Sequence, residues 1–195
     1  RAGAVSLQGD VGVPVLLMND LESTAYGALF LQEDELLALN AGVTRPGHRA
    51  VIAAGTGLGE ALLHWDGRSH SPVATEGGHV DFAPRTEIED SLLKFLRQRF
   101  GAHVSTERVV SGPGLHNVFR FLDEELRRPV APEIRARMVR EDPSAVVGEA
   151  AVAGTSPTCR EAVDLFFDAY GARAGNLALT AMATGGVYVG GGIVT

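Results

Sequence analysis

The chain has 195 residues, of which 45% are apolar and 21% are charged, and its formal net charge is −7. That length and apolar content suit one large domain, or one and a half small ones, with a sizeable buried core. The acidic balance argues against non-specific binding to nucleic acid or to an anionic membrane, because both require a basic face.

Cysteine content and hydropathy narrow the class of protein further. Cys159 is the only cysteine, so the chain itself can form neither a disulfide nor a cysteine-based zinc site. No apolar run reaches the roughly 18 residues that a membrane span requires, and no secretory signal is visible, so we expect a cytoplasmic protein. Because the chain starts at Arg1 and stops at Thr195 directly after a strand-like run, we expect a fragment cut at both ends.

The N-terminal part predicts a strand followed by a helix. VPVLLM at Val13–Met18 is a continuous apolar run of the kind that a parallel sheet buries on both faces. LESTAYGALFL, residues 21–31, predicts a helix, and EDELLALNAG, residues 33–42, predicts a short helical turn or loop.

A second buried strand and a hairpin follow. AVIAA at Ala50–Ala54 predicts the strand, and GTGLG at Gly55–Gly59 predicts a tight turn. The chain would return as a strand over Glu60–Trp65 and continue into a polar loop around Asp66–Ser71.

The rest of the chain is mainly helical by pattern. Thr86 and Glu89 form a capping-box pattern that predicts a helix from residue 87, which Gly101 would end. Ser111 predicts the N-cap of a helix that runs to about Arg128. Further helical patterns lie at Pro132–Arg140, Ser144–Ala153 and Pro157–Thr184, and VYVGGGIV, residues 187–194, predicts a final strand.

Asn19 and Asp20 form the first candidate site. They follow the first predicted strand, at the carboxyl edge where open α/β sheets bind ligands. The Asp20 carboxylate is suited to act as a general base, and the Asn19 amide is suited to orient a hydroxyl. The alternative is that Asp20 only caps the helix that follows it.

The second candidate site consists of two glycine-rich segments, Gly55–Gly59 and Gly190–Gly192. Glycines allow main-chain N–H groups to converge on an anion such as a phosphate. Neither segment is a G-x-x-x-x-G-K-[ST] phosphate loop, because no Lys follows, and the first lacks the spacing of a dinucleotide fingerprint. The alternatives are a plain hairpin turn for the first and a bend or close strand–helix contact for the second.

The third candidate site consists of Glu76, His79 and Glu107. His79 follows Glu76 across two glycines, so both side chains can face one pocket, and we expect the glycines to make room for a ligand. The alternatives are a structural histidine and a solvated ion pair between Glu107 and Arg108. A metal site is disfavoured, because His79 and Asp81 lack a third ligand at a diagnostic spacing. Carboxylates are suited to bind sugar hydroxyls, and glycine-rich segments are suited to bind phosphates. The two together predict a site for sugar phosphorylation.

Five segments resemble the bacterial glucokinases of the ATP-dependent, zinc-free type, within the actin/hexokinase/Hsp70 ATPase superfamily. They are LLMNDLESTAYG, AAGTGLGEALL, EGGHVDFAP, HVSTERVVSGPGL and AGNLALTAMATGGVYVGGGI, in family order from Val13 to the end. EGGHVDFAP and ERVVSGPG are specific, whereas GTGLG alone is not. The resemblance implies an α/β, ribonuclease H-like two-lobed fold of the actin/hexokinase ATPase type. Residues 1–30 would be a remnant of the small lobe that carries the catalytic Asp, and residues 31–195 would be the large lobe.

The resemblance also implies a reaction, which is transfer of the ATP γ-phosphoryl group to the 6-hydroxyl of glucose, the first step of glycolysis. Asp20 would be the catalytic base. The glucose-binding residues would be Asn19, Asp20, Glu76, His79 and Glu107. The ATP-binding residues would be Gly55, Thr56, Gly57, Gly59, Gly190, Gly191 and Gly192, with Mg²⁺ carried by ATP and no zinc.

Two parts of the family pattern do not occur in this chain, namely the first phosphate loop and the C-terminal helices. We therefore expect the 195-residue chain to be an incomplete, inactive piece of a cytoplasmic enzyme, for which the family implies homodimers. The rival interpretations are a glycoside hydrolase, a sugar-sensing regulator of the same fold, and a kinase for mannose or an amino sugar. A hydrolase has no use for phosphate nests, and no basic helix-turn-helix is visible, but hexose selectivity stays open.

Overall fold

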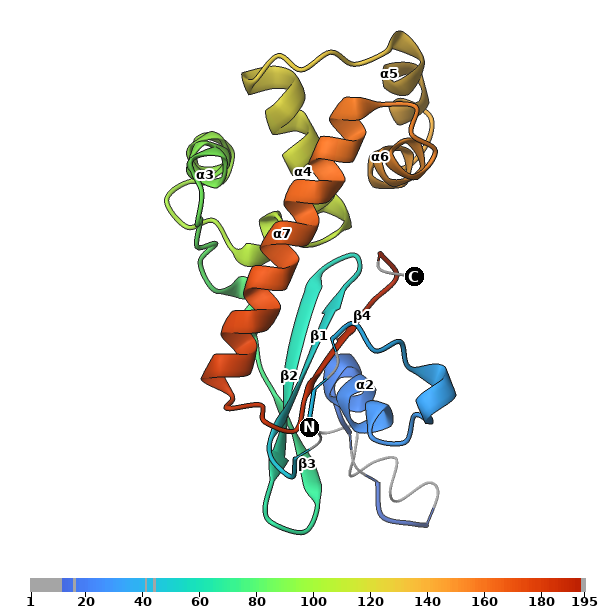
Figure 1. Ribbon diagram of the computed structural model, residues 1–195, viewed down its shortest axis with the longest axis vertical. Coiled ribbons are helices and arrows are strands. Elements are labelled where there is room, and N and C mark those ends of the chain that lie inside the picture. Colours follow the sequence, from blue (N-terminus) through green and yellow to red (C-terminus); the bar gives the residue numbers. More distant parts are fainter. Residues whose placement is uncertain (1–11, 16, 41, 44, 194–195) are drawn as a thin grey trace.

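The computed structural model describes residues 12–15, 17–40, 42–43 and 45–193 as helices around one four-stranded sheet (Figure 1). The strands are β1 (Arg49–Ala54), β2 (Leu58–Trp65), β3 (His70–Ala74) and β4 (Val187–Gly190). Their order is β3-β2-β1-β4, with β2 antiparallel to β1 and β3, and β4 parallel to β1. The central strand β1 therefore contacts both its antiparallel hairpin partner and the parallel strand that follows the helices.

Helices occupy most of the chain outside the sheet. The α-helices are α2 (Asp20–Ala28), α3 (Glu87–Phe100), α4 (Gly112–Arg120), α5 (Pro132–Met138), α6 (Pro143–Val152) and α7 (Pro157–Thr180). Short 3₁₀ segments are η1 (Glu33–Glu35), η2 (Gly77–His79) and η3 (Thr106–Arg108), and a π-helical segment η4 (Phe121–Glu125) extends α4. Among these described helices, none is long and apolar enough to cross a bilayer.

Local capping explains where several helices begin and end. The side chains of Thr86, Ser111 and Ser156 accept hydrogen bonds from backbone amides in the first turns of α3, α4 and α7. Helix α3 ends at Gly101, whose φ of 82° is a left-handed conformation that favours glycine. The predicted starts at Thr86 and Ser111 and the predicted stop at Gly101 are confirmed.

The two faces of the sheet pack against different helices. Ala50, Ile52 and Ala54 of β1 belong to the main core, which also contains residues of α3, α4, α6 and α7. Val51 lies on the opposite face and packs with Ala25 of α2. In Figure 1, α7 passes along one side of the strands and α2 lies on the other. Both faces of β1 are covered, which explains the continuous apolar run Ala50–Ala54 after Arg49.

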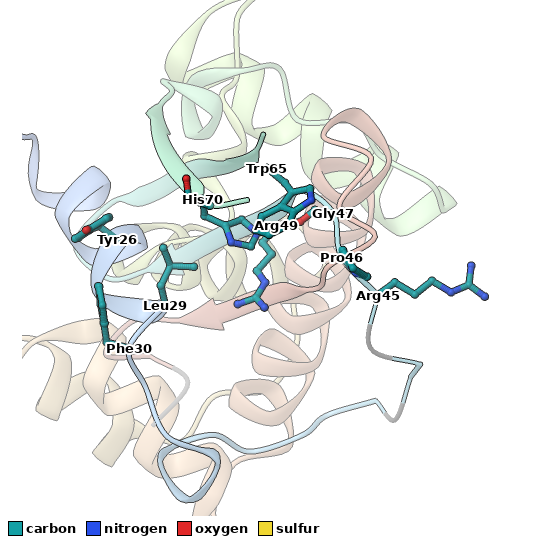
Figure 2. Close-up of a pocket in the computed structure, with 10 residues that line it drawn as sticks. Tyr26, Leu29, Phe30, Arg45, Pro46, Gly47, Arg49, Trp65 and His70 are labelled. Carbon is teal, nitrogen blue, oxygen red and sulfur yellow. Dashed lines mark hydrogen bonds between the residues drawn. The ribbon is translucent and has the colours of Figure 1, made fainter. Parts of the chain in front are cut away.

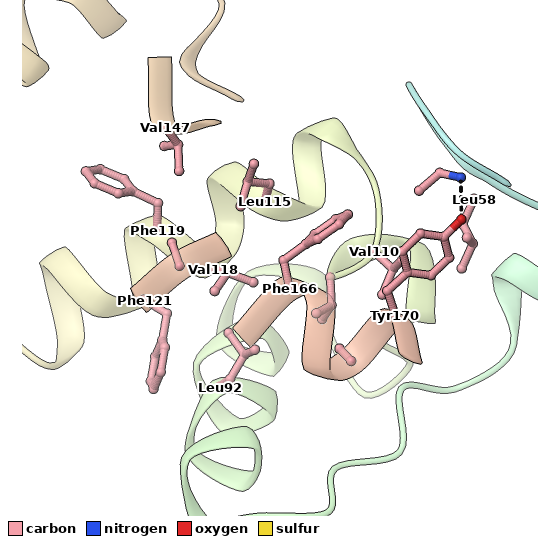
Figure 3. Close-up of a cluster of buried hydrophobic side chains, with 14 of the residues drawn as sticks. Leu58, Leu92, Val110, Leu115, Val118, Phe119, Phe121, Val147, Phe166 and Tyr170 are labelled. Carbon is pink, nitrogen blue, oxygen red and sulfur yellow. Dashed lines mark hydrogen bonds between the residues drawn. The ribbon is translucent and has the colours of Figure 1, made fainter. Parts of the chain in front are cut away.

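Aromatic side chains fill the main core where α4 and α7 approach each other. Phe119, Phe121 and Phe166 are buried in this core, and Figure 3 shows them together with Leu115 and Val118. Large buried rings contribute strongly to packing energy, so this cluster fixes α7 relative to the rest of the core.

Tyr170 connects α7 to the two parallel strands. Its hydroxyl accepts from the Ala54 amide at 3.2 Å and lies 3.1 Å from the carbonyl of Ile52 and 2.9 Å from that of Gly190 (Figure 3). Burial raises the pKa of Tyr170 to about 12, so the hydroxyl stays protonated and able to donate at neutral pH. The carboxyl ends of β1 and β4 are thereby held together.

The predicted strand over Val13–Met18 is wrong. Its described residues are irregular, and Val13 and Leu17 are 57% and 53% exposed. No strand in the described part of the chain pairs with this run, and an isolated strand cannot satisfy its backbone hydrogen bonds. Asn19 and Asp20 therefore begin α2 and do not follow a strand.

Other boundaries also differ from the predicted ones. The loop predicted around Asp66–Ser71 is shorter, because β3 begins at His70. The helix from Ser111 ends with η4 and does not reach Arg128, because Arg127 adopts a left-handed φ of 55°. Helix α7 and the final strand are likewise shorter than predicted. The division into lobes at residue 30 stays a prediction.

Replacing Tyr170 by Phe tests the connection between α7 and the sheet. We expect Tyr170→Phe to lower the free energy of unfolding by about 1–3 kcal/mol, because the buried amide of Ala54 loses its partner. Tyr26→Phe is the matched control, since Tyr26 is exposed, and it should change stability little. Equal urea midpoints for the two variants would contradict the role given to Tyr170.

Candidate active site

The turn between β1 and β2 is the point at which the predicted motifs meet. It lies at the carboxyl end of β1, and the Gly55 amide donates to the Gly57 carbonyl at 2.8 Å. Thr56 at its tip is exposed. The predicted tight turn is confirmed, but it is shorter than Gly55–Gly59, because β2 begins at Leu58 and not at Glu60. The contacts of Gly55–Gly59 with four other segments define the site.

Asn19 and Asp20 reach this turn through the first turn of α2. Asn19 is the N-cap, and its Oδ1 accepts from the Glu22 amide at 2.5 Å, so the alternative that Asp20 caps the helix is wrong. Asp20 is exposed, and within the described structure its carboxylate accepts only from the neighbouring Leu21 amide. The Leu21 side chain occupies the space that a Cβ on Gly59 would need, so α2 packs directly on the turn.

Glu76 and His79 lie side by side on the loop that contains η2. Their Oε2 and Nε2 atoms are 3.7 Å apart, and the side chains are 86% and 59% exposed. Both are therefore available to a ligand. The prediction that the two glycines make room for a ligand is wrong, because a Cβ on Gly77 would overlap the Glu60 carboxylate and one on Gly78 would overlap the Leu58 carbonyl.

Glu107 contacts the turn directly from η3. Its Oε2 accepts from the Leu58 amide at 3.0 Å and closely approaches Gly57. The alternative of an ion pair with Arg108 is wrong, because within the described structure that guanidinium lies over the Phe100 ring, 4.5 Å from its centroid. Glu107 is half-buried, and its Oε1 has no partner among the described residues.

The start of α4 closes one side of the turn. The Gly112 amide donates to the Gly55 carbonyl at 2.8 Å, and the Gly112 carbonyl accepts from Ser144 Oγ of α6 at 2.7 Å. Further along α4, burial lowers the pKa of His116, so this histidine is neutral near pH 7. The charged side chains of the candidate site are therefore mainly the carboxylates of Asp20, Glu76 and Glu107.

The glycines after β4 complete the arrangement. Gly191 has a φ of 99°, and a Cβ there would overlap the backbone of Ala54. Gly190 receives the hydrogen bond from Tyr170, which is the close strand–helix contact weighed as an alternative for this segment. Gly192 is exposed.

The structure connects most, but not all, of the predicted residues by direct contact. Glu107 joins the turn, and Glu76 joins His79, but the Asp20 carboxylate is hydrogen-bonded to neither pair in the described part of the chain. No group of three or more His, Cys, Asp or Glu side chains able to hold a metal occurs among residues 12–15, 17–40, 42–43 and 45–193.

The sequence predictions missed the residues that lie beneath the Glu76 loop. Glu60 is buried in β2 and forms a bidentate ion pair with Arg173 of α7, with N–O distances of 2.5 and 2.6 Å. A single carboxylate at an inward position of an apolar strand, GEALL, was the available signal.

A cavity lies at the other end of β1. It measures about 550 Å³, and Figure 2 shows Tyr26, Phe30, Arg49, Trp65 and His70 around it. None of its lining residues is a carboxylate, so it offers no general base of the kind that phosphoryl transfer to a hydroxyl uses. The chemistry of the side chains therefore favours the glycine turn.

Comparisons with known proteins agree with the motifs. The glucokinase family model matches residues 5–195. A glucokinase of Nostoc sp. is 42% identical over 202 residues, which cover 96% of this chain and 59% of the relative. The crystal structure of a glucokinase from an Antarctic psychrotroph aligns with a TM-score of 0.78 at 31% identity, covering 91% of this chain and 52% of that one.

A more distant structure shares the fold. The ROK family glucokinase of Streptomyces griseus, determined with glucose and AMPPNP, aligns with a TM-score of 0.59 at 23% identity and covers 97% of this chain and 56% of that one. These likenesses confirm the predicted α/β fold class. The chain spans somewhat over half the length of the relatives that it matches.

Gly78→Ala tests the close backbone contact below the Glu76–His79 loop. We expect it to lower the free energy of unfolding by about 1–3 kcal/mol, because the new Cβ overlaps the Leu58 carbonyl. Gly175→Ala in α7 is the matched control, since nothing surrounds its Cβ position, and it should stabilise by about 0.5–1 kcal/mol. Urea unfolding of both variants measures these changes. A Gly78→Ala variant as stable as the parent would contradict the close contact.

Proposed function

This chain belongs to the glucokinase family, and from that premise we propose that the protein carrying it transfers the γ-phosphoryl group of ATP to the 6-hydroxyl of glucose. The observation that carries the proposal is that Glu107 bonds to the glycine turn at the carboxyl end of β1, on which Gly78 of the Glu76–His79 loop and Leu21 of α2 also pack. The comparisons support glucose and ATP as the partners. A homodimer and a cytoplasmic location are expectations from the family alone.

The sugar would be held by Glu76, His79 and Glu107. The first two side chains are exposed next to each other, and Glu107 Oε1 is unpaired in the described structure. Carboxylate oxygens accept hydrogen bonds from hydroxyls, and one carboxylate can accept from two of them. Asn19 would add an amide, although its Oδ1 already caps α2.

The phosphates would lie against the tip of the glycine turn. The amides of Gly55 and Leu58 are already used, by the Gly57 carbonyl and by Glu107. The amides of Thr56 and Gly57, which have no partner among the described residues, are left to meet an anion. Gly190–Gly192 would border the nucleotide from the parallel strand.

Charge explains why ATP would arrive with Mg²⁺. The site presents the carboxylates of Asp20, Glu76 and Glu107, which repel an uncompensated triphosphate. A divalent cation bridging the phosphate oxygens neutralises that charge and stabilises the charge that develops during transfer. We therefore propose Mg²⁺ as a component of the nucleotide substrate.

Asp20 would be the catalytic base. It occupies the first position of α2, and its exposed carboxylate is free to accept the proton of the attacking hydroxyl. Leu21 anchors it to the same turn that would hold the phosphates. Phosphoryl transfer depends mainly on positioning and charge, and this common anchor would hold the base and the phosphate at one turn.

Asp20→Asn should lower kcat about 10²–10⁴-fold in the protein that carries this chain, with little change in glucose binding. Asp34→Asn is the control, because Asp34 is an exposed acid on η1, and it should leave kcat unchanged. An Asp20→Asn variant with the parental kcat would remove Asp20 from the mechanism.

A hexose panel tests the reaction itself. We expect ATP-dependent phosphorylation with glucose as the preferred sugar over mannose and amino sugars. Sugar binding without turnover would favour the sugar-sensing interpretation, and ATP-independent release of sugar from a glycoside would favour the hydrolase.

A further inference from the structure

The centre of β2 carries a charge on the face that belongs to the main core. Glu60 is 1% exposed and pairs across the sheet with Ile52. A carboxylate removed from water there needs a charged partner, and Arg173 supplies one: Nε donates to Oε1 at 2.5 Å and Nη2 to Oε2 at 2.6 Å. The pair joins strand β2 to helix α7.

The same ion pair contacts the loop that carries Glu76 and His79. Arg173 Nη2 also donates to the Gly77 carbonyl at 3.2 Å. The Glu60 carboxylate fills the space next to Gly77, so no other residue fits at that position without moving the pair. The backbone immediately after Glu76 is therefore held by both members of the pair.

The main chain of Glu60 holds the loop on the other side of Glu76. Thr75 Oγ1 donates to the Glu60 carbonyl at 2.8 Å and accepts from the Gly77 amide at 3.1 Å. The His79 amide in turn donates to the Glu76 carbonyl at 3.0 Å. Glu76 thus lies between Thr75, which bonds to the main chain of Glu60, and Gly77, which bonds to Thr75 and to Arg173. His79 follows in the same turn.

We propose that Glu60 and Arg173 are positioning residues for sugar binding. They fix the backbone of Thr75–Gly77 and so direct the exposed side chains of Glu76 and His79 toward the hexose. Neither touches the sugar, since the Glu60 side chain is 0% and the Arg173 side chain 17% exposed. The identity of the ligand as a hexose rests on the proposed function. The contacts by which Glu60 and Arg173 fix the Thr75–Gly77 backbone rest on the geometry alone.

Stability by itself gives little reason for this ion pair. An apolar pair of similar volume is often as stable as a buried salt bridge, although removal of one partner alone is strongly destabilising. The double variant Glu60→Met/Arg173→Met should therefore fold while losing the hydrogen bond to Gly77. The matched control is Asp123→Leu/Arg135→Met, which removes another bidentate pair, with N–O distances of 2.6 Å, that lies on η4 and α5.

The test compares these variants in the protein that carries this chain. For the Glu60→Met/Arg173→Met variant we expect faster hydrogen exchange at the Gly77 and His79 amides and a glucose KM raised roughly 10- to 100-fold, with the ATP KM unchanged. Arg173→Lys, which keeps the charge but not the planar fork, should give an intermediate glucose KM. The control variant should alter neither readout.

Three results separate the possible failures. Unchanged exchange in the double variant, or faster exchange with an unchanged glucose KM, would overturn the inference. If the unmodified protein phosphorylates no hexose, the proposed function fails, and the exchange data still decide whether the pair holds the loop. If the double variant does not fold, Arg173→Lys provides the test. A raised glucose KM with an unchanged ATP KM would support the inference, and an unchanged glucose KM would overturn it.

Discussion

Close backbone contact at the carboxyl end of β1 is the constraint on which the rest of the structure depends. Gly78 packs against the Leu58 carbonyl, Gly191 packs against Ala54, and the Gly112 amide bonds to the turn itself. The approaches of Gly78 and Gly191 are possible because glycine has no Cβ, and interiors packed at crystal density cannot absorb an extra atom there. Three segments that are far apart in the sequence therefore meet at one turn.

This packing suits the proposal that one turn serves two ligands. Glu107, which bonds to the turn, and Glu76 and His79, on the loop that packs against Leu58, are suited to hydroxyls, whereas the amides of Thr56 and Gly57 at the tip are suited to phosphate. Helix α2 packs on the same turn and carries the proposed base. In the proposed reaction, the phosphoryl donor, the sugar and the catalytic base would all be positioned by this one turn, as phosphoryl transfer requires.

The sequence predicted those features that depend on neighbouring residues. Caps at Thr86 and Ser111, the buried strand β1 and the glycine turn have local signatures, and the family motifs identified the candidate residues. Features that depend on distant partners were missed or mispredicted. The run at residues 13–18 has the composition of a strand but no partner in the described structure, and Glu60 meets Arg173 across 113 residues of sequence.

The most direct test of the account is a crystal structure of the protein that carries this chain with glucose and a non-hydrolysable ATP analogue. The account predicts glucose hydroxyls within hydrogen-bond distance of Glu76, His79 and Glu107, and a phosphate on the amides of Thr56 and Gly57. Glucose bound instead in the cavity beside Trp65, at the opposite end of β1, would contradict it.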